Sequence, residues 1–186
     1  MTRTTYHHGD LHRVLIDAAL ELIAERGPNA VSLRDLARAA GVSHAAPAHH
    51  FGDKAGLFTA IATQGQLLLA DQLAADLADG RDLRRLGASY VRFAADHPSH
   101  FEVMYRPDLY HQDDPDLAAA RTRAGDLLRS AIPGDGQVAD RRMLAAWSIA
   151  HGFATLRRTG NLDRLLAGSD PDTEFAEMAG LLDLTP

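Results

Sequence analysis

Three histidines, His44, His49 and His50, lie within seven residues of the stretch VSHAAPAHHFGDK. Imidazole rings can bind a metal ion, move protons in catalysis or form hydrogen bonds with a partner molecule. The spacing of the rings and the residues around them decide among these alternatives.

The spacing argues against a metal centre. The three histidines are separated by five residues and by one, whereas two ligands on one helix face usually lie three or four residues apart. No carboxylate completes an HExxH pattern, and the chain has no cysteine. We expect no metal and no cofactor, and elemental analysis for bound metal would test this.

Catalytic signatures are also missing from the sequence. There is no GxSxG motif, no phosphate-binding loop and no cysteine nucleophile. Ser43 and His44 are adjacent, but neighbours on a helix point about 100° apart. We therefore do not predict an enzyme.

Two short helices joined by a glycine turn would position the histidines. Ser32 is the expected N-cap of the first helix, with Asp35 three residues later in a pattern like a capping box. Gly41 ends that helix, and Ser43 is the expected cap of a second helix from His44 to Phe51. This arrangement is a helix-turn-helix. Val42, Ala46 and Phe51 would pack inward, and His44, Ala45, His49 and His50 would point outward.

The rest of the chain also shows helical periodicity and almost no strand pattern. Asp10 is the expected N-cap of a first helix that ends at Gly27-Pro28. Asp53 is the expected N-cap of a long helix from Lys54 to about Asp79. Further helices are predicted near 82–96, 98–106, 113–131, 137–159 and 171–184. The predicted fold class is all-α, with an N-terminal three-helix head on a larger C-terminal helical bundle.

Composition and charge are compatible with a soluble protein that binds DNA. No apolar run approaches the roughly 20 residues that span a bilayer, the N-terminus lacks the apolar core of a signal peptide, and we expect a cytoplasmic protein. Residues 1–54 hold six basic and six acidic side chains, so the formal charge of −6 lies entirely in residues 55–186. Six of the ten histidines are in the first segment, and their protonation would make it positive.

Residues 11–61 resemble the DNA-binding head of TetR-type transcriptional repressors. The resemblance rests on LIDAALELIAERG and on VSLRDLARAAGVSHAAPAHHFGDKAGLFTAI. The later segment WSIAHGFATLRRTG is similar to a branch of the family that has a Trp-His-Gly motif, here Trp147, His151 and Gly152.

This resemblance implies roles for residues of the head. Ser32, Arg34, Ser43 and Lys54 would contact DNA phosphates. The residues that read bases or contact the backbone would be His44, Ala45, Ala46, His49 and His50. One departure is Ala48, where the family usually carries an aromatic residue, often tyrosine, that contacts a phosphate. Either DNA affinity is lower than is typical or the neighbouring histidines compensate.

The resemblance also implies a dimer whose C-terminal bundle binds a small effector. The aromatic and titratable side chains that could line a pocket are Tyr90, Phe93, Phe101, Met104, Tyr105, Trp147 and His151. The alternative is that they are ordinary core residues. The last helix carries an apolar stripe, formed by Phe175, Met178, Leu181 and Leu182, which needs a partner within the chain or across a dimer.

The sequence thus predicts a ligand-responsive transcriptional regulator, a repressor that binds a palindromic double-stranded operator as a homodimer. Its expected parts are a flexible arm over residues 1–9, a DNA-binding domain over 10–53, and a ligand-binding and dimerisation domain over 54–186. The rival hypothesis is a helical small-molecule-binding or interaction protein with weakened DNA binding, which Ala48 and the uncharged head motivate. If the histidines meet DNA, affinity should rise as pH falls from about 8 to 6.

Overall fold

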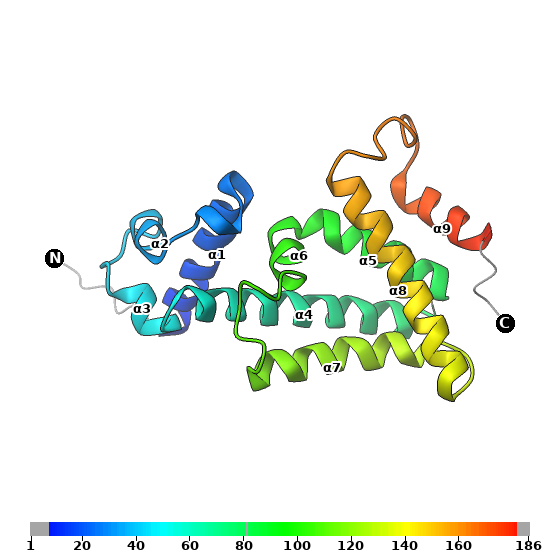
Figure 1. The fold of residues 1–186 in the computed structure, drawn as a ribbon, viewed down its shortest axis with the longest axis horizontal. Helices are drawn as coiled ribbons and strands as arrows, with labels where there is room; N and C mark the ends of the chain where they lie inside the picture. The colour runs from blue at the N-terminus through cyan, green and yellow to red at the C-terminus, as the bar shows by residue number, and fades with distance from the viewer. Residues whose placement is uncertain (1–7, 81, 182–186) are drawn as a thin grey trace. The chain divides into compact units, whose positions relative to one another are not determined.

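The computed structural model describes residues 8–80 and 82–181, with side chains from Leu11 onward. These described residues form helices and contain no β-strand, so the predicted all-α fold class is confirmed (Figure 1). In chain order the elements are α1 (His8–Arg26), η1 (Pro28–Ala30, a 3-10 helix), α2 (Leu33–Ala39), α3 (Ala46–Phe51), α4 (Lys54–Ala78), α5 (Leu83–Asp96), α6 (Pro98–Met104), α7 (Pro115–Ser130), α8 (Gly136–Arg158) and α9 (Pro171–Leu181).

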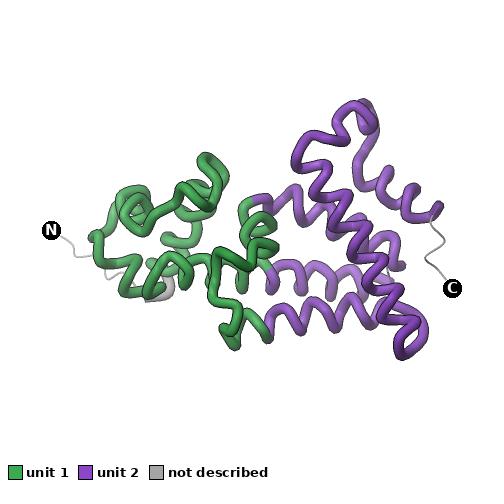
Figure 2. Tube along the Cα trace, viewed as in Figure 1, with its two compact units in different colours: residues 1–65, 99–118 green, residues 66–98, 119–186 purple. Residues whose placement is uncertain are grey.

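The described chain divides into two compact units (Figure 2). Unit 1 contains the residues up to Gly65 together with Ser99–Ala118, and unit 2 contains Gln66–Pro98 together with the residues from Ala119 onward. Helices α4 and α7 contribute to both units. Most of the arm predicted over residues 1–9 lies outside the described residues.

Two predicted helix starts are wrong. Helix α1 begins at His8, so Asp10 lies inside the helix and is not its N-cap. Helix α3 begins at Ala46 with Ala45 as its N-cap, rather than at His44 with Ser43 as the cap. The reason is Pro47, which has no N–H and is tolerated only in the first turn of a helix. A helix that began at His44 would place Pro47 where its missing N–H should bond to the Ser43 carbonyl.

Other helix ends follow the sequence prediction. The Ser32 hydroxyl accepts a hydrogen bond from the Asp35 amide at 3.1 Å, which caps α2. A carboxylate oxygen of Asp53 accepts from the Gly56 amide at 2.7 Å at the start of α4. These caps depend on residues three positions apart, which is why local sequence predicts them.

The core of unit 1 gathers apolar side chains from α1, α2, α4, α6 and the start of α7. Fully or almost fully buried members include Leu15, Ile16, Ile23, Leu36, Leu57, Phe58, Ile61, Val103 and Leu117. The hydroxyl of Ser99, in the first turn of α6, donates to the Leu20 carbonyl of α1 at 2.9 Å. Helix α6 is thereby joined to α1 within this unit.

In unit 2, helix α5 packs against α8 and α9 (Figure 1). The rings of Phe153 on α8 and Phe175 on α9 meet edge to face, with centroids 5.3 Å apart. Arg92 on α5 pairs with Asp172, at the start of α9, at 2.6 Å. Apolar packing and an ion pair therefore hold α9 on this unit.

Candidate nucleic-acid interface

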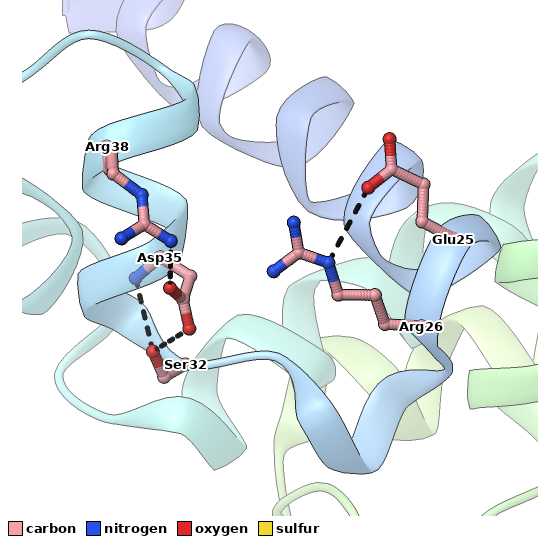
Figure 3. A network of polar contacts seen from close by, with 5 residues as sticks. All are labelled: Glu25, Arg26, Ser32, Asp35 and Arg38. Atoms are coloured by element: carbon pink, nitrogen blue, oxygen red, sulfur yellow. Dashed lines mark hydrogen bonds and ion pairs between the residues drawn. The ribbon is translucent and has the colours of Figure 1, made fainter.

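A hydrogen-bonded network fixes the first turn of α2 (Figure 3). The Ser32 hydroxyl donates to Asp35 at 2.6 Å, and Arg38 pairs with the other carboxylate oxygen of Asp35 at 2.5 Å. The Ser32 hydrogen bond, with the charge of Arg38, holds the pKa of Asp35 below its usual value. The charges of Arg26 and Arg34 act in the same direction. Arg38 therefore contacts this carboxylate directly, whereas Arg26 and Arg34 act on it only through their charge.

The turn between α2 and α3 is closed by two backbone hydrogen bonds. Gly41, with a φ of 66°, donates to the Arg38 carbonyl at 3.3 Å, and Val42 donates to the Ala37 carbonyl at 3.0 Å. This pair of bonds defines a Schellman motif, which needs a residue in the left-handed conformation. Ala37 is fully buried, and its small side chain lets the two helices approach closely. The predicted helix-turn-helix is confirmed.

The outward surface around α3 differs in part from the sequence prediction. His44, Ala45 and His49 are exposed as predicted, and so is Ala48. Pro47 is buried, which the sequence reasoning missed, because a proline in the first turn can pack inward without losing a hydrogen bond. The exposed side chains around α3 are therefore His44, Ala45, Ala48 and His49.

Of the three histidines predicted to contact DNA, His50 is the least exposed. It is half-buried, and its ring centroid lies 6.4 Å from that of His12 on α1 and 6.3 Å from that of Phe51. His12 itself lies 5.0 Å from the Phe51 ring. His12 was not predicted as part of this surface, because its closeness to α3 depends on how the helices pack.

Lys54 makes contacts within the head. Its ammonium donates to the Asn29 carbonyl in η1 at 2.9 Å and lies 5.5 Å from the centroid of the Phe58 ring. The exposed phosphate-contact candidates are Arg34 and Ser43. Ser32 is half-buried and takes part in the cap of α2. Arg38 is exposed on the same helix as Arg34 and was not predicted, although its i, i+3 spacing from Asp35 signals the ion pair.

Three of the predicted effector residues meet in unit 2. The Tyr90 hydroxyl lies 2.9 Å from Nδ1 of His151, and the Trp147 ring centroid lies 5.8 Å from that of His151. Tyr90 is buried, His151 is half-buried, and burial lowers the pKa of His151. The Trp147 ring retains 40% exposure.

The remaining predicted effector residues have partners nearby within their own units. Phe93 is fully buried and packs against His97, with centroids 4.9 Å apart. Phe101 packs against Tyr105 at 5.0 Å in unit 1. Met104 is buried, and its sulfur would lie 2.5 Å from a β-carbon built on Gly65. These contacts favour the core interpretation for Phe93 and Met104.

A polar cleft of about 630 Å³ lies between α5 and α9 in unit 2. Its walls carry three arginines and four acids, and none of the predicted effector residues lines it. The lining charged residues are Arg84, Arg85, Arg92, Asp82, Asp170, Asp172 and Glu177.

The apolar stripe predicted on the last helix is only partly covered by the described chain. Phe175 is buried within the chain, at 2% exposure, and packs on Phe153. Met178 is half-buried and Leu181 is 85% exposed, while Leu182 lies outside the described residues. On α8, the described chain exposes Val138, Leu144, Trp147 and Leu156.

The described residues contain no group of three histidine, cysteine or acidic side chains that could hold a metal ion. None of their helices is both long and apolar enough to span a membrane.

A three-helix head with a helix-turn-helix, followed by a helical C-terminal region, defines a class of DNA-binding regulators. Residues 15–61 match the model of the family described as bacterial regulatory proteins, tetR family. Residues 83–182 match the model described as tetracyclin repressor-like, C-terminal domain. The chain belongs to the TetR family, and it is a DNA-binding transcriptional regulator.

Several individual proteins are similar to this chain. A solved structure of a protein with unknown function from Rhodococcus sp. RHA1 is 33% identical, with a TM-score of 0.79, and covers 98% of this chain and 97% of its own. The uncharacterized HTH-type transcriptional regulator Rv0681 of Mycobacterium tuberculosis is 24% identical over 169 residues, covering 88% of this chain and 76% of its own length. The HTH-type transcriptional repressor Rv3405c of the same species is 37% identical over 86 residues, covering 44% of this chain and 45% of its own length.

Proposed function

We propose that this regulator is a ligand-responsive repressor that binds a palindromic operator as a homodimer through α3 and the turn before it. The observation that carries the proposal is an exposed surface formed by His44 and Ala45, just before α3, and by Ala48 and His49 on α3, whose Pro47 is buried on the inner side. Small side chains and hydrogen-bonding rings on a short helix suit a major groove about 12 Å wide.

Phosphate contacts would position this helix on the duplex, and base contacts would select the sequence. Arg34 and Ser43 are exposed on either side of the turn. Arg38 is a third candidate, because it is exposed and its hydrogen bond to Asp35 orients the guanidinium. Ser32 would act mainly through the cap of α2. His44, Ala45 and His49 would face base edges, while Ala46 and His50, both half-buried, would contribute less.

The dimer would form on α8 and the end of α9. Val138, Leu144 and Leu156 expose between 46% and 60% of their surface on α8, and Leu181 exposes 85% on α9. Apart from its own helix, no part of the described chain would lie within 4 Å of a β-carbon at Gly152, so the helix surface there is open to a partner. A second copy would cover these apolar side chains and give two recognition helices for a palindrome, with half-sites about 34–36 Å apart.

The effector would bind in the C-terminal region, and Tyr90, Trp147 and His151 are the residues that we propose for it. Their side chains combine two rings with one titratable group, and Trp147 is accessible. An effector that binds one spacing of the recognition helices better than another would shift the population between them.

The remaining parts of the proposal follow from the family. The functional division would place the DNA-binding domain from the start of α1 at His8 to residue 53, and the ligand-binding and dimerisation domain at 54–186. Trp147, His151 and Gly152 support membership of the branch with the Trp-His-Gly motif. We propose that the protein is not an enzyme, needs no cofactor and acts in the cytoplasm, where it meets DNA.

Selection of duplexes from a random DNA library by the purified protein tests this function. We expect an enriched inverted repeat with half-sites one helical turn, or a multiple of it, apart. Ala45→Glu, which places a negative charge on the surface proposed to face DNA, should abolish enrichment. Ala119→Glu, at an exposed alanine of α7, is the matched control and should leave it unchanged.

The rival is a helical ligand-binding protein with weakened DNA binding. The exposed Ala48, in place of the family's usual aromatic residue, specifically favours it. A folded, dimeric protein that enriches no sequence, even at low salt, would support the rival and contradict the repressor proposal.

A further inference from the structure

Lys54 begins α4 at the position where the resemblance implies a lysine that contacts DNA phosphate. In the structure its ammonium instead turns toward η1 and donates to the Asn29 carbonyl at 2.9 Å. The ammonium also lies 5.5 Å from the centroid of the Phe58 ring, and that ring is fully buried in the core of unit 1. A cation over an aromatic face gains electrostatic attraction from the ring.

The backbone of Lys54 is held in place independently of its side chain. Asp53, the preceding residue, accepts a hydrogen bond from the Gly56 amide at 2.7 Å and so caps α4. The side chain of Lys54 therefore extends from a fixed helix end to the turn that joins α1 to α2.

A second positively charged side chain, that of Arg106, also contacts Asn29. Nη2 of Arg106, in the segment after α6, donates to the side-chain oxygen of Asn29 at 3.3 Å. Asp108 orients the same guanidinium through contacts of 2.9 and 2.8 Å, which raise the pKa of Arg106. Both oxygens of Asn29 thus accept hydrogen bonds from charged groups that come from different elements.

The position of Asn29 determines where α2 begins. The turn η1 is followed by Val31, which is 3% exposed and anchored in the core, and then by Ser32, the N-cap of α2. Helix α2 carries Arg34 on its exposed side and packs against α3. A change at η1 would therefore move the phosphate-contacting side of the head.

We infer that Lys54 is a positioning residue, which supports DNA binding by holding η1 and the start of α2 and does not neutralise a phosphate. Arg106 has the same role from the segment after α6. The inference rests on the proposed DNA-binding function and changes the role that the resemblance implies for Lys54.

Salt dependence of DNA affinity separates the two roles. Each phosphate that a side chain neutralises contributes about 0.9 to the slope of log affinity against log salt concentration, so a dimer loses about 1.8 when one such residue is removed. Lys54→Met keeps an unbranched apolar side chain over Phe58 and removes the ammonium. We expect it to weaken operator binding about three- to tenfold for each half-site, as for one lost hydrogen bond per protomer, with the slope of the parent protein.

Arg34→Met is the matched comparison, because Arg34 is an exposed cation of the same head and a proposed phosphate contact. It should reduce the slope by about 1.8. The operator is the duplex obtained by selection, and affinity is measured by fluorescence anisotropy over about 50 to 200 mM salt. A slope for Lys54→Met that falls as much as that for Arg34→Met would overturn the inference.

Hydrogen exchange in the free protein gives a second readout that a phosphate contact would not change. Lys54→Met should speed exchange of the amides from Val31 to Asp35, while Arg34→Met should not. Lys54→Leu, which also lacks a donor, replaces Lys54→Met if that variant folds poorly. Equal protection of these amides in the parent and the Lys54 variants would contradict the positioning role.

The two proposals can fail separately. If the parent protein binds no DNA, the proposed function fails, and the exchange experiment still decides whether Lys54 holds the start of α2. If the parent binds its operator but Lys54→Met loses slope, the proposed function stands and the inference about Lys54 fails.

Discussion

The ring of Phe175 on α9 occupies the space next to Gly87 on α5, so a β-carbon on Gly87 would overlap the ring. The absent side chain at Gly87 is what lets α9 lie close to α5. Phe175 also packs on Phe153 of α8, so one aromatic ring joins three helices of unit 2.

Gly87→Ala should therefore destabilise the docking of α9. Overpacking a filled site lowers the free energy of unfolding by about 1–3 kcal/mol. The better helix propensity of alanine offsets roughly 0.5–1 kcal/mol of this loss. We expect a net loss in the free energy of unfolding, measured by urea denaturation at fixed protein concentration. Phe175→Leu in the Gly87→Ala background should recover part of the loss, and a purely additive double variant would contradict the contact.

Gly152→Ala tests the dimer surface. Because no part of the described chain outside the same helix lies within 4 Å of the added methyl group, the variant should fold as well as the parent. If α8 pairs with a second copy there, the methyl group should raise the dimer dissociation constant several-fold, as measured by analytical ultracentrifugation. Gly125→Ala on α7, equally open within the chain, is the control. Equal dissociation constants for both variants and the parent would place the dimer contact elsewhere.

His151 should make stability depend on pH. Burial lowers its pKa in the folded protein below the ordinary value of 6.5, so the unfolded chain binds the proton more readily. The free energy of unfolding should fall as pH drops below about 6.5 and level off below the folded-state pKa. His151→Gln should lose this part of the pH dependence, whereas His44→Gln, at an exposed site, should keep it. Chemical denaturation between pH 5 and 8 measures both, and identical profiles for His151→Gln and the parent would refute the prediction.

Ala48→Tyr should strengthen DNA binding. Ala48 is exposed on α3, where a tyrosine hydroxyl could donate to a phosphate, as the family resemblance implies. One hydrogen bond to a charged group corresponds to roughly tenfold in affinity. Ala48→Phe, with the same ring and no hydroxyl, separates the hydrogen bond from the added surface. Equal affinity of the two variants for the selected operator would exclude a hydroxyl contact.

DNA affinity should rise as pH falls from about 8 to 6 at constant salt. Protonated imidazoles add positive charge to a head whose fixed charges balance, and DNA phosphates attract it. His44 and His49 are exposed on the surface proposed to face DNA, whereas His50 is half-buried against His12. Anisotropy titrations with a His44→Gln, His49→Gln double variant check this. If the DNA affinity of the double variant changes with pH as much as that of the parent, groups other than His44 and His49 cause the pH dependence.

Features that depend on near neighbours in sequence could be predicted from the sequence. Ser32 and Asp53 cap helices through amides three residues later, and the left-handed turn at Gly41 follows from glycine alone. The wrong start predicted for α3 is also local, because Pro47 excludes a helix from His44. The preference of proline for the first turn of a helix predicts the observed start at Ala46.

Contacts between distant parts of the chain were decided only by the tertiary structure. Helical periodicity shows that Phe175 needs an apolar partner, but not that Phe153 and Gly87 provide it. The family resemblance implies that Lys54 contacts a DNA phosphate. In the folded chain, however, the Asn29 carbonyl lies 2.9 Å from the Lys54 ammonium. The meeting of Tyr90 with His151, 61 residues later, likewise depends on how α5 and α8 pack. The physical reason is that caps and periodicity act within a few residues, while partners across the fold are set by the packing of helix faces.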